Sequence, residues 1–149
     1  MQTLKNLNKD LAVNLALNTL AIGKQALFFV STKRSAEKLA EDISKALKKE
    51  IPTEAQNELS VKLSKVLRPK TKQCIRLSKI ALHGVVFHHS GLASKQREII
   101  EQGFRSGIVK IICCTPTLAA GVDLPAFRSV IKDVKRFTQR GMQYIPVLE

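Results

Sequence analysis

The sequence predicts an α/β fold in which a mainly parallel sheet carries helices and one helical insertion. Short, continuous apolar runs alternate with stretches of helical periodicity along the chain. Continuous apolar runs are expected of strands covered on both faces, and strands that alternate with helices favour a parallel sheet. The length of 149 residues suits one domain with a real hydrophobic core.

The first part of the chain predicts a strand between two helices. Leucine and alanine recur at near-helical spacing up to Gly23, which ends the first helix. The continuous apolar run over 25–31 then predicts a strand. An apolar stripe over 36–47 predicts the next helix, and its solvent-facing side is expected to include Glu37 and Glu41.

A helical pair over 51–84 is expected to form an insertion before the next strand. Pro52 breaks the preceding pattern, and Thr53 with Gln56 predicts a capping box at the start of the first helix of the pair. The second helix is expected over about 71–82. The insertion therefore separates the first strand and its helix from the rest of the sheet.

The second half of the chain returns to alternating strands and helices. Small turn residues and short apolar runs mark the boundaries. The expected elements are a strand at 85–88, a helix capped by Ser94 that runs to about Phe104, a strand at 108–114 and a strand at 128–134. The tail over 136–149 has no clear periodicity.

Three polar loops follow predicted strands, at 31–34, 89–92 and 115–123. In parallel sheets the carboxyl ends of the strands share one edge, where ligands bind. Loops of glycine and short hydroxyl residues let backbone N–H groups approach a phosphate, and the start of a helix favours anions. Lys33 and Arg34 add positive charge there. The sequence therefore predicts phosphate contacts at this edge.

Each loop also has a purely structural interpretation. Thr32 or Ser35 can simply cap the following helix, and Gly91 can serve a tight turn with His89 packed behind it. The carboxylate of Asp123 can accept ribose hydroxyls or pair with a cation, or it can only close a turn.

The formal net charge of +13 is concentrated in the insertion, where residues 62–79 contain seven Lys or Arg and no acid. Such an excess usually faces a polyanion, and the alternative is a solvated surface. We expect no membrane contact, because the chain has no apolar run of the roughly 20 residues that span a bilayer and no basic amphipathic helix with aromatic anchors. The first residues lack a signal peptide's apolar core, so we expect an intracellular protein.

Several catalytic and metal-binding patterns are missing from the sequence. It contains neither a Gly-x-x-x-x-Gly-Lys-[Ser/Thr] phosphate loop nor an acidic box that would hold magnesium. The three cysteines form no Cys-x-x-Cys pair, so we expect buried, reduced thiols. The three histidines lack partners at metal-ligand spacing. We therefore expect no catalytic residue and no metal site in this chain.

In combination, these motifs resemble the second RecA-like domain of a superfamily 2 helicase. Residues 26–47 resemble motif IV and its helix, 87–92 resemble the His-His-[Ala/Ser]-Gly-Leu segment, and 115–126 resemble motif V in the form typical of the superkiller-like branch. The insertion and the tail are similar to those of archaeal DNA-repair helicases related to the helicase part of polymerase theta. The sequence ends before the segment that resembles motif VI would begin, and both Walker motifs are absent.

The resemblance implies a RecA-like three-layer sandwich, with residues 1–149 forming a partial second motor domain of a longer helicase. The intact enzyme would use ATP and Mg²⁺ to move 3′ to 5′ on single-stranded or forked DNA, in the cytoplasm and associated with the nucleoid. Its partner domain would be the first RecA-like domain of the same polypeptide, and no cofactor is expected to bind this part alone. Two alternatives remain: a non-catalytic nucleic-acid-binding module, and an RNA helicase domain of the same branch.

The candidate site residues fall into three groups. The resemblance carries the family's contacts with the nucleic-acid strand onto Ser31, Thr32, Arg34, Thr115, Thr117 and Leu118, and its nucleotide-cleft contacts onto Gly121 and Asp123. Their position at predicted strand ends adds Lys33, Ser90 and Gly91. The charge of the insertion adds Lys70, Lys72 and Arg76.

Overall fold

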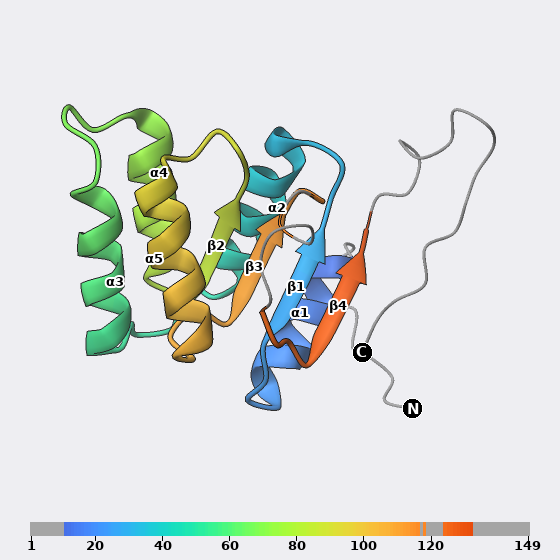
Figure 1. The fold of residues 1–149 in the computed structure, drawn as a ribbon. Helices are drawn as coiled ribbons and strands as arrows, with labels where there is room; N and C mark the ends of the chain where they lie inside the picture. Colours follow the sequence, from blue (N-terminus) through green and yellow to red (C-terminus); the bar gives the residue numbers. More distant parts are fainter. Residues whose placement is uncertain (1–10, 117, 119–123, 133–149) are drawn as a thin grey trace, which may run out of the picture.

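The computed structural model describes residues 11–116, 118 and 124–132. These residues form five helices and four strands, and a run of three helices, α2 to α4, separates the first strand from the second, as expected from the sequence (Figure 1). The elements are α1 (Leu11–Ala21), β1 (Ala26–Phe29), α2 (Lys33–Ala46), α3 (Glu54–Ser64), α4 (Lys72–Ala81), β2 (Val85–His88), α5 (Ser94–Arg105), β3 (Ile111–Cys114) and β4 (Arg128–Ile131).

The four strands form one parallel sheet in the order β2-β3-β1-β4. Ala26 of β1 pairs with Ile111 of β3 on one side and with Arg128 of β4 on the other, while Val85 of β2 also pairs with Ile111. Because the strands are parallel and in register, their carboxyl ends lie along one edge. The predicted parallel α/β fold is confirmed.

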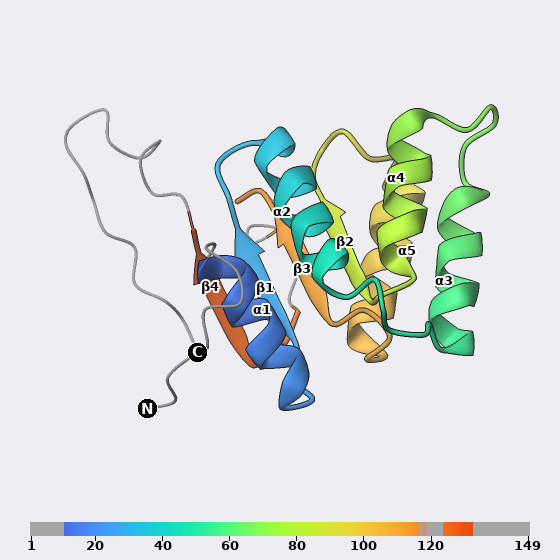
Figure 2. The ribbon, with the colours of Figure 1, turned by 180° about the vertical axis from the view of Figure 1, so that it is seen from behind.

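Helices cover both faces of the sheet, which gives the expected three layers. Figures 1 and 2 show α1 and α2 on one face and α5 on the other, with α3 and α4 beyond β2. Phe28 of β1, Phe87 of β2, and Ile111 and Ile112 of β3 are fully buried, as is Phe104 of α5. Burial on both faces explains why these strands read as continuous apolar runs rather than as alternating ones.

Helices α3 and α4 share the core of the rest of the domain. Thr53 Oγ1 accepts the Gln56 N–H at 3.1 Å and Gln56 Oε1 accepts the Thr53 N–H at 2.9 Å, so the predicted capping box is confirmed. Leu63 of α3 and Leu77 of α4 are fully buried in the same cluster as the strands. The two helices are added between β1–α2 and β2, but they pack into the same hydrophobic core as the sheet. The boundaries of the insertion at 51–84 stay a prediction.

Some predicted boundaries are wrong by a few residues. The first and third strands are shorter than 25–31 and 108–114, because only Ala26–Phe29 and Ile111–Cys114 pair in the ladder. Ser94 does not cap α5: the N-cap is Ala93, whose N–H donates to Gln96 Oε1 at 3.1 Å. The end of the last strand and the tail over 136–149 lie outside the described residues. All three cysteines are free and buried, as expected.

Candidate nucleic-acid interface

Three polar loops meet at the carboxyl edge of the sheet, as the sequence predicts. Backbone bonds beyond the strands hold the loops together: the Val30 N–H donates to the Cys114 carbonyl at 2.9 Å, and the Thr115 N–H donates to the His88 carbonyl at 3.4 Å. In Figure 1 this edge is the one toward which the strand arrows point. We call it the strand-end surface, and its described members are Ser31, Thr32, Lys33, Arg34, Ser90, Gly91 and Thr115.

The loop after β1 begins helix α2 with a capped, positively charged end. Thr32 Oγ1 accepts the Ser35 N–H at 3.0 Å, and the two hydroxyls are 2.8 Å apart, so Thr32 is the N-cap. Lys33 and Arg34 in the first turn are exposed, and no acidic residue accompanies them there. A helix N-terminus with two cations attracts anions. Capping occupies the Thr32 hydroxyl, and a phosphate contact at this helix start stays a prediction.

The loop after β2 is a tight turn in which Gly91 closes onto a buried histidine. The Gly91 N–H donates to His89 Nδ1 at 3.0 Å, and the His89 side chain is only 1% exposed. A Cβ at Gly91 would lie 2.9 Å from His89 Cε1 and 3.8 Å from Lys33 Cδ. The structural interpretation of His89 is therefore confirmed. Ser90 and Gly91 remain exposed, and the Gly91 backbone lies beside the Lys33 side chain.

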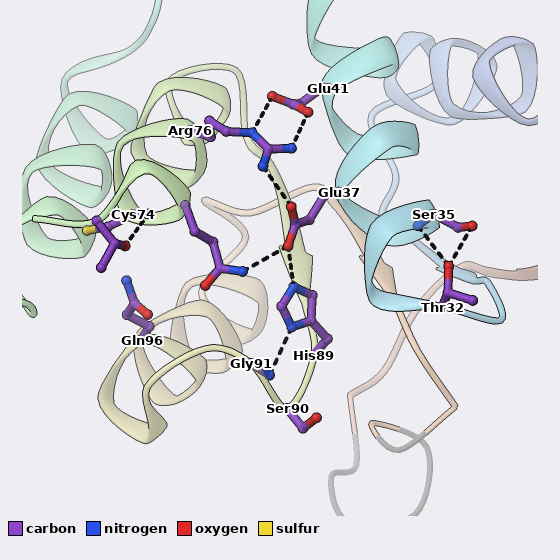
Figure 3. A network of polar contacts seen from close by, with 12 residues as sticks. Thr32, Ser35, Glu37, Glu41, Cys74, Arg76, His89, Ser90, Gly91 and Gln96 are labelled. Carbon is purple, nitrogen blue, oxygen red and sulfur yellow. Dashed lines mark hydrogen bonds and ion pairs between the residues drawn. The ribbon is translucent and has the colours of Figure 1, made fainter.

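A carboxylate that we expected on the solvent side of its helix holds this histidine (Figure 3). Glu37 accepts hydrogen bonds from His89 Nε2 at 2.8 Å, Gln73 Nε2 at 2.9 Å and Arg76 Nη1 at 2.8 Å. Burial opposes ionisation of Glu37, but the hydrogen bonds from His89 and Gln73 and the charge of Arg76 outweigh it and lower its pKa. The prediction that Glu37 simply faces solvent is wrong, because α4 and the loop after β2 pack over it.

Arg76 is engaged within the same network. Its Nε and Nη2 donate to the two Glu41 oxygens at 3.0 and 2.6 Å, while Nη1 donates to Glu37. The hydrogen bonds to Glu41 raise the Arg76 pKa above its ordinary value despite partial burial. Two carboxylates thus compensate the charge that we had assigned to nucleic acid. A nucleic-acid contact by Arg76 stays a prediction, with this competition against it.

His88, the neighbour of His89, points to the opposite layer of the sandwich. Its Nε2 lies 2.8 Å from Glu101 Oε2 of α5, and burial lowers its pKa even though Glu101 favours the charged form. Arg97 of α5 donates to the carbonyls of Ser90 at 3.3 Å and Leu92 at 2.7 Å.

The sequence analysis did not identify the supporting roles of Glu37, Glu101 and Arg97. The only local signal was their position, one or two turns into a helix that follows a strand end.

The loop after β3 is only partly described. Thr115 lies at the edge but is 8% exposed, and its carbonyl accepts the Leu118 N–H at 3.2 Å. Leu118 is buried at 3% exposure, so its side chain belongs to the core. Three further candidates, Thr117, Gly121 and Asp123, lie outside the described residues.

A second basic region lies near the strand-end surface. The segment 65–72 joins α3 to the start of α4, and Figures 1 and 2 show it at the same end of the molecule as the strand arrowheads. We call it the basic turn. Its four cations are exposed, and within the described part of the chain none of them forms an ion pair; they are Lys65, Arg68, Lys70 and Lys72.

Other features of the described residues do not add a small-molecule or metal site at this edge. No group of three His, Cys, Asp or Glu side chains among them could hold a metal ion. A cavity of about 420 Å³ lies at the opposite edge, where its lining includes Leu17, Leu47, His83 and Lys110. Within the ranges that the structure covers, no helix is long and apolar enough to cross a membrane.

Comparison with known proteins places this arrangement in a family. Residues 8–138 match the model of the helicase conserved C-terminal domain. The chain is 41% identical over 150 residues to a protein of Methanocella arvoryzae named ATP-dependent DNA helicase Hel308, and this match covers 99% of the chain and 20% of that protein. Proteins of the same name from Methanococcus vannielii and Pyrococcus abyssi are 35% and 39% identical, over 99% and 85% of the chain.

The chain spans about a fifth of the length of these curated relatives, since it covers 20%, 20% and 18% of them. The resemblance to the second RecA-like domain of superfamily 2 helicases is confirmed by the family match and by the parallel α/β sheet. The chain belongs to the helicase conserved C-terminal domain family.

Proposed function

We propose that the chain acts as the second motor domain of an ATP-dependent 3′–5′ DNA helicase and that its strand-end surface binds the backbone of single-stranded DNA. The observation that carries the proposal is the convergence of loops from β1, β2 and β3 on one edge, beside the capped start of α2. The relatives, named as DNA helicases, support DNA as the nucleic acid. Such a protein would work in the cytoplasm, associated with the nucleoid.

The chemistry of the surface suits a sequence-independent contact. The start of α2 offers backbone N–H groups and the cations Lys33 and Arg34, while the exposed Ser90 offers its hydroxyl in the adjacent turn. Contacts of this kind are made with phosphate and sugar, and they carry no information about the base. A motor that moves along any strand requires contacts of this type.

The ATP cleft would be completed by the first RecA-like domain of the same polypeptide. Gly121 and Asp123 would face the nucleotide from this side. The donor set within the described residues does not fit Mg²⁺, which prefers several oxygen ligands. The proposal therefore assigns the metal to the partner domain, with no catalytic step on this chain, and the purified chain is expected to hydrolyse no ATP with or without DNA.

The test is a binding measurement on the purified chain. Fluorescence anisotropy with two unrelated single-stranded DNA oligonucleotides should show similar affinities, both decreasing steeply with salt because phosphate contacts release counterions. The double variant Lys33→Gln/Arg34→Gln should weaken binding. Its control, Lys48→Gln/Lys49→Gln, removes the same charge from exposed residues after the far end of α2 and should leave binding nearly unchanged. Salt-independent binding, or equal losses in both variants, would contradict the proposed surface.

The exposed cations of the basic turn favour a second candidate, a non-catalytic binding module in which Lys70 and Lys72 contact the nucleic acid.

An RNA strand of matched sequence distinguishes the RNA alternative, because 2′-hydroxyl contacts would make RNA bind more tightly than DNA. Detectable DNA-stimulated ATP hydrolysis by the pure chain would contradict the assignment of the catalytic parts to another domain.

A further inference from the structure

Glu37 joins three parts of the fold at one point beside the strand-end surface (Figure 3). It lies on α2, and it accepts hydrogen bonds from His89, which follows β2, and from Gln73 and Arg76 of α4. Its side chain is only 13% exposed. A largely buried carboxylate with these donors determines how the segment after β2 packs against α2.

The geometry fixes the protonation pattern of His89. The Gly91 backbone N–H can only donate, so His89 Nδ1, 3.0 Å away, must be the acceptor and carries no proton. The ring proton of the neutral imidazole is then on Nε2, which donates to Glu37 at 2.8 Å. Phe87 stacks on the same ring with centroids 5.5 Å apart and planes within 5°. Glu37, Gly91 and Phe87 therefore hold both the tautomer and the orientation of the ring.

The held ring in turn sets the exposed turn. Gly91 lies close to both the His89 ring and the Lys33 side chain, because a Cβ there would be 3.0 Å from Nδ1 and 3.8 Å from Lys33 Cδ. Lys33 and Glu37 are four residues apart on α2, so they share one face of the helix. The same helix face thus carries the exposed cation and the carboxylate that fixes the ring behind the turn.

We propose that Glu37 is a positioning residue for the strand-end surface. By holding His89 with its proton on Nε2, it leaves Nδ1 free to accept from Gly91 and so fixes the turn that carries the exposed Ser90, whose hydroxyl can donate to a nucleic-acid phosphate. In this proposal Glu37 itself does not contact the nucleic acid. This inference rests on the proposed function of the surface.

The test uses Glu37→Met with Glu41→Met as the matched control. Both changes remove one negative charge next to Arg76, but only Glu37 touches His89, and methionine offers no oxygen to accept the His89 Nε2 proton. Imidazole and amide signals of the ¹⁵N-labelled chain report the His89 tautomer and the Gly91 hydrogen bond. Anisotropy with single-stranded DNA reports binding. Removing a negative charge by itself should tighten binding to DNA, so a loss of affinity runs opposite to the electrostatic effect.

In Glu37→Met we expect altered His89 and Gly91 signals and a loss of affinity of roughly two- to tenfold, the range for one hydrogen bond. Glu41→Met should keep the signals and bind at least as tightly as the wild type. Unchanged signals in Glu37→Met, or altered signals with unchanged affinity, would overturn the positioning role. Failure of the wild-type chain to bind any strand would overturn the proposed function instead, since the two signals can still be read without DNA.

His89→Phe provides a second route if Glu37→Met does not fold. The phenyl ring keeps the stacking on Phe87 and the burial but removes both hydrogen bonds of the ring. It should lose affinity to the same degree. The double variant with Glu37→Met should lose no more, because both changes act through one set of bonds. Additive losses would show that Glu37 acts independently of His89 and would also overturn the inference.

Discussion

The strand-end surface and the basic turn are both exposed and positively charged, but they are supported in different ways. Behind the first lie a capped helix start, a glycine turn closed onto a buried ring, and carbonyls held by Arg97. The second presents Lys70 and Lys72 without ion-pair partners among the described residues. The first can therefore fix the geometry of a phosphate contact, and the second adds only attraction.

Arg76 shows why charge alone does not separate these two roles. In the sequence it belongs to the same basic run as Lys70 and Lys72. In the structure it lies one turn into α4 and bridges to Glu37 and Glu41 of α2. A positive side chain in a basic run can thus form ion pairs that stabilise the fold instead of contacting nucleic acid. Which of these it does depends on whether another element places a carboxylate opposite it.

The largest expected effect comes from closing the space at Gly91. In Gly91→Ala the new Cβ would lie 2.9 Å from His89 Cε1, and the ring cannot move freely because Glu37 and Phe87 hold it. We expect a loss of about 1–3 kcal/mol in the free energy of unfolding, as for other overpacked sites, measured by urea denaturation. The neighbouring Ser90→Ala is the control and should change stability by less than about 0.5 kcal/mol. Equal effects would show that the turn is not closed onto the ring.

The second-largest expected effect is a difference in the free energy of unfolding between variants of Arg76 and Lys72. Arg76→Met keeps most of the side-chain length but removes the hydrogen bonds to Glu37 and Glu41. Because the Arg76 side chain is 42% exposed, solvent screening reduces the effect, and we expect a loss of about 1 kcal/mol. Lys72→Met, with no ion pair to lose within the described ranges, should stay within about 0.5 kcal/mol of the wild type. A comparable loss in both variants would remove the distinction drawn above.

A smaller effect tests whether the basic turn contacts DNA at all. Each phosphate contact with a single strand contributes about 0.7 to the slope of log affinity against log salt. Lys70→Gln and Lys72→Gln should each lower that slope by about this amount. Lys79→Gln removes one charge near the other end of α4 and should leave the slope unchanged. If all three variants behave alike, the charge of the turn is only a solvated surface.

The smallest effect is a pH dependence at the strand ends, which the lysines and arginines of the basic turn do not share. Burial lowers the pKa of folded His88 below its ordinary value of 6.5, so the unfolded chain takes up a proton that the folded chain resists. Stability contributed by His88 is therefore fully present above pH 6.5 and decreases as the pH falls toward the folded-state pKa. His88→Gln should show a flatter dependence of urea midpoints between pH 7.5 and 5.5. Identical pH profiles would contradict the shift.

The sequence by itself determined the fold class and the edge where the candidate site lies. Continuous apolar runs and helical periodicity are local patterns, and they located every strand and helix that the structure describes, with boundaries off by a few residues. Once the strands are parallel, their carboxyl ends must share an edge, so the loops at 31–34 and 89–92 were expected to meet there. The capping box at Thr53 is equally local and was found from spacing alone.

Only the tertiary structure decided which polar side chains support that edge. Glu37 looks like any solvent-facing acid of an amphipathic helix, but its partners lie 36, 39 and 52 residues away along the chain. The same holds for Arg76, whose role depends on α2 packing beside α4. A local pattern records which residues face away from their own helix's apolar stripe. It does not record which other element will pack over them, and that packing turned an expected surface carboxylate into the acceptor that holds His89.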